Sequence, residues 1–178
     1  MEITLVRHTK VNVHSGICYG QADVGLSETF YAEALQIAGQ LMGHTFDAVF
    51  TSPLNRCTRL AYQLGYHNAI RDDRLIELNF GDWELKPWEN ITGEYAERWM
   101  EDYLNLPCPG GESLQDLVGR VADFYRTINK KFNKVLVFSH SGPIRVFHHL
   151  VRPTDYHLDK LFEWKIDFGS VFVIKNTI

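Results

Sequence analysis

The sequence has little cysteine and no long apolar run. Its three cysteines, Cys18, Cys57 and Cys108, are widely spaced, and no C-x-x-C pair suggests a zinc site or a redox pair. No stretch approaches the ~20 apolar residues of a membrane-spanning helix, and no basic region followed by an apolar one opens the chain. These scarcities argue against a disulfide-built scaffold and against an integral membrane protein, and they predict a cytoplasmic protein with reduced thiols.

An excess of positive charge is also missing. The chain has 18 Lys and Arg against 22 Asp and Glu, a formal net charge of -4, so it has no general attraction for nucleic acid or for an anionic membrane. A length of 178 residues with 45% hydrophobic residues suits one folded domain with one core. We therefore expect a single domain over residues 1–178 whose partner is a small molecule; no feature indicates an oligomeric state.

The apolar patterning predicts strands and helices in alternation. Strands are expected at 3–6, 47–51, 68–71, 135–138 and 171–174, and helices at 27–42, 52–65, 114–128, 142–151 and 154–163. Ser113, with Asp116 three residues later, resembles a capping box. A segment at 86–108 is a predicted insertion, with an aromatic-rich helix at about 88–104. The alternation implies a three-layer α/β/α fold with a mostly parallel central sheet.

Polar residues follow the predicted strands directly. Arg7 and His8 follow the first strand, and His140 follows the strand at 135–138. Ser52 and the proline after it predict a helix start, which would make Arg56 the fourth residue of that helix. Because ligands bind at the carboxyl ends of parallel strands, we expect these side chains to share one site.

This set of residues suits a phosphoryl group. Arginine binds phosphate oxygens in bidentate fashion, and the free N–H groups of the helices after Ser52 and Gly142 favour an anion. A neutral imidazole is nucleophilic near pH 7, so His8 is the candidate phosphoryl acceptor. Glu77, flanked by apolar residues, is the candidate general acid, because partial desolvation would favour its protonated form.

At this point the chain resembles a known family, the histidine phosphatase superfamily, also called phosphoglycerate-mutase-like. The matching motifs occur in the family's order and span most of the chain. They are Leu5-Val6-Arg7-His8, Ser52-Pro53-Leu54 with Arg56, Glu77 with Phe80-Gly81 and Trp83-Glu84, Pro109-Gly110-Gly111-Glu112-Ser113, and Ser139-His140-Ser141-Gly142.

The resemblance implies roles for the candidate residues. In it, His8 becomes phosphorylated, Glu77 acts first as acid and then as base, and Arg7, Arg56 and His140 hold the phosphoryl group. It implies neither a metal nor another cofactor. The chain is also short for a cofactor-dependent mutase of this superfamily, which favours hydrolysis.

A departure from the family pattern points to one branch. Thr9 and His14 stand where the family usually has glycine and asparagine, and Leu85 stands where glycine often follows Trp-Glu. With the run 18–23 and Arg56-Cys57, the chain resembles the α-ribazole 5'-phosphate phosphatases, which act late in cobalamin assembly. The residues expected to touch substrate are Thr9, Tyr19, Gln21 and Ser141.

Three alternatives stay open. A broad-specificity or sugar-phosphate histidine phosphatase would keep the same motifs. A metal hydrolase could use two histidines and a carboxylate, although Arg7 and Arg56 would repel a dication. A non-catalytic phosphate-binding module would need the arginines but neither His8 nor Glu77. The aromatic residues between Trp88 and Tyr103 are expected mainly to pack together, and a wall for a flat base is their second interpretation.

Overall fold

A computed structural model describes residues 1–152 and 155–175. Within them, one sheet has the strand order β3-β2-β4-β1-β5. Its strands are β1 (Glu2–Arg7), β2 (Ala48–Thr51), β3 (Ile70–Arg71), β4 (Lys134–Ser139) and β5 (Val171–Lys175). The first four run parallel, and β5 pairs with β1 in the antiparallel sense. The predicted α/β class and mostly parallel sheet are confirmed.

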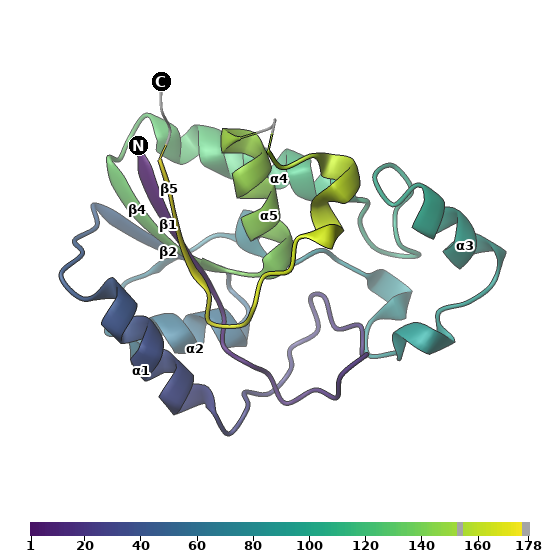
Figure 1. Ribbon diagram of the computed structural model, residues 1–178, viewed down its shortest axis with the longest axis horizontal. Helices are drawn as coiled ribbons and strands as arrows, with labels where there is room; N and C mark the ends of the chain where they lie inside the picture. The colour runs from purple at the N-terminus through teal and green to yellow at the C-terminus, as the bar shows by residue number, and fades with distance from the viewer. Residues whose placement is uncertain (153–154, 176–178) are drawn as a thin grey trace.

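Helices cover both faces of this sheet (Figure 1). The helices α1 (Phe30–Leu41) and α2 (Asn55–Gln63) pack on one face, and α4 (Leu114–Asn129) and α5 (Ser141–Val151) pack on the other. Side chains alternate along a strand, so the β4 residues Val135 and Val137 join the α4 and α5 core while Leu136 and Phe138 join the other. Both faces are buried, which explains the uninterrupted apolar run.

Helix α4 follows its sequence signals closely. The Ser113 hydroxyl accepts a hydrogen bond from the Asp116 N–H, and the Asp116 carboxylate accepts one from the Ser113 N–H. This reciprocal pair is the predicted capping box. The buried residues of the helix recur at spacings of three and four, which places one apolar stripe on the sheet. They are Leu114, Leu117, Val121, Phe124 and Ile128.

Two helix starts differ from prediction. Helix α1 begins at Phe30, because the Ser27 hydroxyl bonds the Thr29 side chain and does not cap the helix. Helix α2 begins at Asn55 with Leu54 as its N-cap. Ser52 is not the cap residue, and Arg56 is therefore the second residue of α2 and not the fourth.

The segment 86–108 does not form one helix. It contains a 3-10 turn at Trp88–Asn90 and the helix α3 (Glu94–Glu101). Gly93 lies between them with φ 99°, a left-handed conformation that ends any continuous helix at this point. Figure 1 shows α3 beyond the end of the sheet. The predicted helix over 88–104 is therefore wrong in its continuity.

Irregular segments occupy much of the remaining chain. Short 3-10 helices at Asp73–Leu75 and Gly81–Trp83 lie between β3 and the segment 86–108, where the sequence predicts neither a strand nor a helix. A 3-10 helix at Leu158–Glu163 replaces most of the helix predicted from Thr154, a residue outside the described part of the chain.

None of the helices in the described part of the chain combines the length and apolar character needed to span a bilayer. The single-domain organisation and the cytoplasmic location stay predictions.

Candidate active site

Three neighbouring strands deliver polar residues to one edge of the sheet. Arg7 at the end of β1 lies opposite Ser139 at the end of β4, and Thr51 of β2 lies opposite Phe138. The residues that follow these strands are His8, Ser52 and His140. The parallel register therefore brings them together, as the sequence pattern predicts.

The His8 imidazole is buried and fixed in one tautomer. Only 1% of the residue is exposed, and its Nδ1 lies 2.7 Å from the Thr9 carbonyl oxygen. Since a carbonyl only accepts, Nδ1 carries the proton and Nε2 keeps a free lone pair. Burial lowers the pKa of His8 well below 6.5, and the charges of Arg56 and Arg7 lower it further. His8 is therefore a neutral imidazole near pH 7, the form that a nucleophile requires.

The second imidazole, His140, lies against the first. The two ring centroids are 5.1 Å apart. The His140 Nδ1 accepts a hydrogen bond from Arg56 Nε at 3.2 Å, so Nε2 carries the proton and donates to the Ser52 hydroxyl oxygen at 2.8 Å. Burial, followed by the charge of Arg56, lowers the pKa of His140. Ser52 thus orients this ring, which explains why it does not cap α2.

Arg56 is fully buried beside both histidines. Besides His140, it donates to the carbonyl oxygens of Ala22 at 2.9 Å and Gly20 at 2.5 Å. A guanidinium has five N–H groups, so two remain for an anion. The Cys57 thiol lies next to this group and donates to the Ser139 carbonyl oxygen. Burial raises the pKa of Cys57 to about 12, so the thiol stays protonated.

The loop that holds Arg56 is itself held by Glu84. The Glu84 carboxylate accepts from the backbone N–H groups of Gln21 at 2.8 Å, Ala22 at 2.5 Å and Phe80 at 3.1 Å. A Cβ at Gly20 would lie 2.4 Å from Glu84 Oε1, so this approach requires glycine. Glu84 belongs to the Trp83-Glu84 motif, but its role in holding this loop is not predicted from the sequence.

Arg7 lines the mouth of the site. Its Nη1 donates to the Ile166 carbonyl oxygen, and its guanidinium carbon lies 3.9 Å from the Phe168 ring centroid. Its buried Nε has no hydrogen-bond partner in the described ranges 1–152 and 155–175. Tyr19 lies with its ring centroid 5.4 Å from the Arg56 guanidinium carbon, and burial raises the pKa of its hydroxyl. Arg7 and Arg56 therefore both keep N–H groups available to a phosphoryl oxygen.

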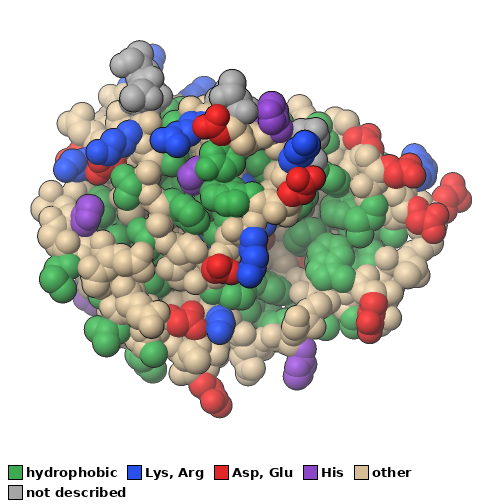
Figure 2. All heavy atoms as spheres, viewed as in Figure 1, with side chains coloured by type: hydrophobic (Ala, Val, Ile, Leu, Met, Phe, Trp, Pro, Cys, Tyr) green, Lys and Arg blue, Asp and Glu red, His purple; other side chains and the backbone are tan. Residues whose placement is uncertain are grey.

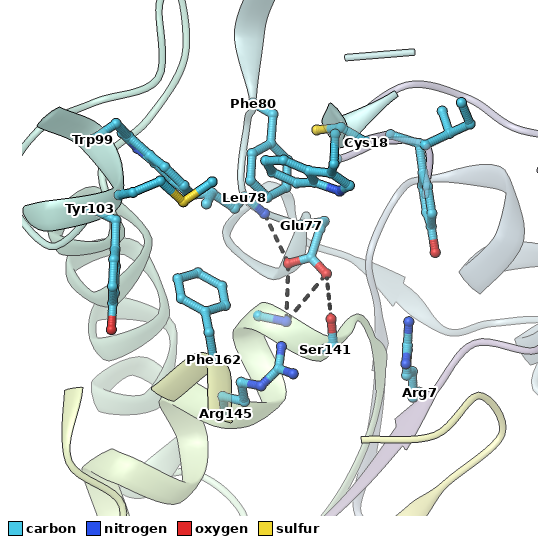
Figure 3. Close-up of a pocket in the computed structure, with 16 residues that line it drawn as sticks. Arg7, Cys18, Glu77, Leu78, Phe80, Trp99, Tyr103, Ser141, Arg145 and Phe162 are labelled. Carbon is cyan, nitrogen blue, oxygen red and sulfur yellow. Dashed lines mark hydrogen bonds between the residues drawn. The ribbon is translucent and has the colours of Figure 1, made fainter. Parts of the chain in front are cut away.

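The Glu77 carboxylate lies at the amino terminus of α5 (Figure 3). It accepts from the Gly142 N–H at 3.1 and 3.2 Å and from the Ser141 hydroxyl at 3.1 Å. The Leu78 N–H adds a fourth contact at 3.0 Å. A Cβ at Gly142 would lie 2.1 Å from Glu77 Oε1, so only glycine lets the carboxylate reach the helix end. Ser141, an expected substrate contact, is bonded to Glu77 in this structure.

Two side chains hold the backbone of Glu77 by hydrogen bonds. Its carbonyl oxygen accepts from Arg120 Nη2 at 2.9 Å and from Gln21 Nε2 at 3.0 Å. Arg120 also donates to the carbonyl oxygens of Arg74 and Ile76 and pairs with Glu112 at 2.8 Å. Arg120 belongs to none of the sequence motifs, so its role is not predicted from the sequence. Gln21 is an expected substrate contact, whereas its amide here donates to the Glu77 backbone.

Thr9 is the remaining expected substrate contact. It is fully buried, and its Oγ1 has no hydrogen-bond partner within the described part of the chain. It does not line the cavity described next, whereas Tyr19 and Ser141 do. The structure therefore groups Arg7, Tyr19, Glu77 and Ser141 around the cavity. The other predicted site residues lie outside its wall: His8, Arg56, His140, Thr9 and Gln21.

A cavity of about 420 Å³ opens beside Glu77. One wall is aromatic. Some of its rings meet edge to face, as Phe80 and Trp88 do with centroids 5.2 Å apart, whereas Trp88 and Trp99 are stacked. In Figure 2, hydrophobic side chains gather on the side of the molecule that carries α3. The rings of this wall come from four separate segments of the chain. They are Phe80, Trp88, Trp99, Tyr103 and Phe162.

The site thus joins two parts with different chemistry. The inner part holds a neutral nucleophile, two arginines with free N–H groups and a second imidazole, and it suits a phosphoryl group. The outer part is an apolar cavity with a carboxylate at its entrance. Within the described residues, no group of three or more His, Cys, Asp and Glu side chains is arranged to hold a metal ion.

Curated relatives of the chain are phosphatases and mutases. It is 30% identical to phosphoserine phosphatase 1 of Hydrogenobacter thermophilus, over 98% of this chain and 86% of that one. It is 33% identical to the 2,3-bisphosphoglycerate-dependent phosphoglycerate mutase of Brucella anthropi, over 80% and 77%. It is 32% identical to the adenosylcobalamin/alpha-ribazole phosphatase of Salmonella typhimurium, over 80% and 75%.

A solved structure and a family model agree with this grouping. The alpha-ribazole phosphatase from Shigella flexneri has the same fold, with a TM-score of 0.86 over 98% of this chain and 90% of that one, at 22% identity. The family model for the histidine phosphatase superfamily (branch 1) matches residues 3–177. The chain therefore belongs to the histidine phosphatase superfamily, and it is an enzyme that hydrolyses phosphate monoesters.

Proposed function

We propose that the protein hydrolyses α-ribazole 5'-phosphate through a phosphohistidine formed on His8. The relative from Salmonella typhimurium carries this activity in its name. The two-part site supports the same proposal, because Arg7, next to His8 in the chain, lines a cavity that suits a flat, apolar leaving group. The proposed catalytic residues are those named from the sequence. They are His8, Glu77, Arg7, Arg56 and His140.

In the first step, the His8 Nε2 lone pair attacks phosphorus. A new N–P bond forms while the ester P–O bond breaks in line with it. Arg7, Arg56 and His140 hold the phosphoryl oxygens and stabilise the charge that spreads over them. Protonated Glu77 gives its proton to the leaving oxygen, so the alcohol departs neutral and Glu77 becomes a carboxylate.

In the second step, a water molecule takes the place of the alcohol. The Glu77 carboxylate accepts a proton from this water as its oxygen attacks phosphorus. The N–P bond breaks, inorganic phosphate forms, and the electron pair returns to His8 Nε2. The hydrogen bonds from Gly142 and Ser141 hold the carboxylate in place for both steps.

The observation that carries the choice of substrate is the aromatic wall. A volume of about 420 Å³ lies in the range of pockets that enclose a whole small organic molecule. The benzimidazole ring of α-ribazole can stack on such a wall and bury its faces there. The leaving group of phosphoserine or of phosphoglycerate has no ring to fill this space.

A comparison of esters tests the proposal. The purified protein is assayed for phosphate release from α-ribazole 5'-phosphate, O-phosphoserine, glucose 6-phosphate and 2,3-bisphosphoglycerate. We expect kcat/KM for the first ester to exceed the others by about tenfold or more, because burial of the ring favours its transition state. Equal values for all four esters would instead support the broad-specificity phosphatase.

Phosphoserine is the second candidate substrate, because the phosphoserine phosphatase aligns with 98% of this chain. The same assay distinguishes the two. Turnover of none of these esters, nor of phenyl phosphate, would favour the non-catalytic binding module.

A further inference from the structure

Arg145 is a second arginine that lines the cavity, besides Arg7, and it is not one of the proposed phosphoryl-binding residues. It lies four residues after Ser141 on α5, so the two side chains share a helix face. In Figure 3 its guanidinium lies on the side of Glu77 that carries Phe162, whereas Arg7 lies on the other side. A group bound by Arg145 would therefore be on the aromatic side of the general acid.

The guanidinium is fixed at one nitrogen and free at two. Its Nε donates to the Trp164 carbonyl oxygen at 2.8 Å, and its central carbon lies 5.7 Å from the Phe162 ring centroid. Neither terminal nitrogen has a hydrogen bond or an ion pair within the described chain. Four N–H groups are therefore left for a ligand in the geometry of a planar fork.

The Arg145 guanidinium is partly buried in this arrangement. Burial lowers the pKa of Arg145, while the nearby Glu77 carboxylate opposes that shift. A partly desolvated cation among aromatic rings is stabilised when a ligand supplies hydrogen-bond acceptors in place of lost water. The Glu77 carboxylate does not serve, because its oxygens are already bonded to the start of α5.

We propose that Arg145 is a specificity residue that binds two adjacent oxygen acceptors on the leaving group. The inference rests on the proposed phosphatase function and narrows its substrate class. The preferred ester would carry either vicinal hydroxyls, as a ribose does, or a carboxylate, beyond the carbon that bears the phosphate. A leaving group that is a plain hydrocarbon ring fills the cavity but leaves Arg145 unpaired.

The test compares Arg145→Met and Arg145→Lys with wild type on three esters. α-Ribazole 5'-phosphate offers vicinal hydroxyls, O-phosphoserine offers a carboxylate, and phenyl phosphate offers neither. We expect Arg145→Met to raise KM about 10- to 100-fold for the preferred acceptor-bearing ester and to change phenyl phosphate turnover by less than about twofold. Arg145→Lys should lose an intermediate amount, because it keeps the charge without the fork.

The controls separate this role from others. Arg126→Met removes an exposed arginine of α4 and should change no KM. Competitive inhibition by inorganic phosphate should be the same in wild type and in Arg145→Met, because the proposed phosphoryl-binding residues Arg7, Arg56 and His140 are unchanged. If Arg145→Met does not fold, Arg145→Lys against wild type gives the same comparison of esters.

Two results would overturn the inference. An equal loss of kcat on all three esters would mean that Arg145 acts on Glu77 and not on the leaving group. An unchanged KM for both acceptor-bearing esters would mean that it binds neither. The proposed substrate is a separate question: it would be wrong if wild type preferred phosphoserine to α-ribazole 5'-phosphate. In that case, a selective loss of phosphoserine turnover in Arg145→Met would still support the role of Arg145.

Discussion

His148 makes the stability of the protein depend on pH. It lies on α5 with 6% of its surface exposed, and neither ring nitrogen has a hydrogen-bond partner among the residues that the structure describes. Aromatic rings surround it, with centroids at 4.5 Å for Trp164, 4.9 Å for Tyr156 and 5.4 Å for Phe172. Burial, which disfavours the charged imidazolium here, lowers the pKa of His148 from 6.5 to about 4.

The sign and the size of the effect follow from linkage. In the unfolded chain His148 takes up its proton near pH 6.5, whereas in the folded protein it does so only near pH 4. Its contribution is therefore complete above pH 6.5 and is lost as the pH falls from 6.5 to 4. Between pH 7.5 and 4.5 this group alone should cost about 2.5 kcal/mol of unfolding free energy.

The variant His148→Leu removes the titrating group at similar side-chain volume. Urea unfolding followed by tryptophan fluorescence gives the unfolding free energy of both proteins at pH 7.5 and at pH 4.5. Wild type should lose about 2.5 kcal/mol more than the variant over this interval. Burial also lowers the pKa of His8 and His140, but these groups act equally in both proteins and cancel in the difference.

A control variant, His44→Leu, removes an exposed histidine and should show the acid sensitivity of wild type. The reasoning is refuted if His148→Leu loses as much stability as wild type, since the acid sensitivity would then arise elsewhere. An increase in acid sensitivity would contradict it as well.

Three further predictions concern the supports of the site and one strained residue. Glu84→Gln should lower kcat/KM about tenfold or more by loosening the loop that holds Arg56, with phosphate inhibition weakened in parallel in steady-state assays. Arg120→Met should lower kcat about tenfold with little change in KM, since it frees the backbone of Glu77 without touching substrate. Leu85→Gly should raise the unfolding free energy by about 0.5–1 kcal/mol in urea titrations, because Leu85 is exposed and has φ 64°; an unchanged or lower value would argue against strain there.

Elements with local signals were predictable from the sequence. Strand β4 has an uninterrupted apolar run at 135–138, and the run of β1 at 3–6 is interrupted only by Thr4, because helices cover both faces of these strands. This pattern depends on no distant contact. The predicted capping box at Ser113 is confirmed, because it depends only on two residues three positions apart. Because the parallel order of these strands follows from the alternation with helices, the meeting of His8 and His140 was also predictable.

Features that depend on distant contacts were not predictable. Ser52 is a residue type that often caps helices, but its hydroxyl forms a hydrogen bond with His140, 88 positions later in the chain. Arg120 reaches the carbonyl oxygen of Glu77 from α4, and a backbone acceptor leaves no mark in the sequence. The partner of Arg145 is likewise a carbonyl oxygen, that of Trp164.

The central claim is that His8 carries the phosphoryl group during turnover. The most direct measurement quenches the enzyme in base during steady-state hydrolysis of phenyl phosphate and maps the modified peptide by mass spectrometry. The account predicts one phosphoryl group on His8, with neither label nor turnover in His8→Ala. A label on another residue, or full turnover by His8→Ala, would contradict it.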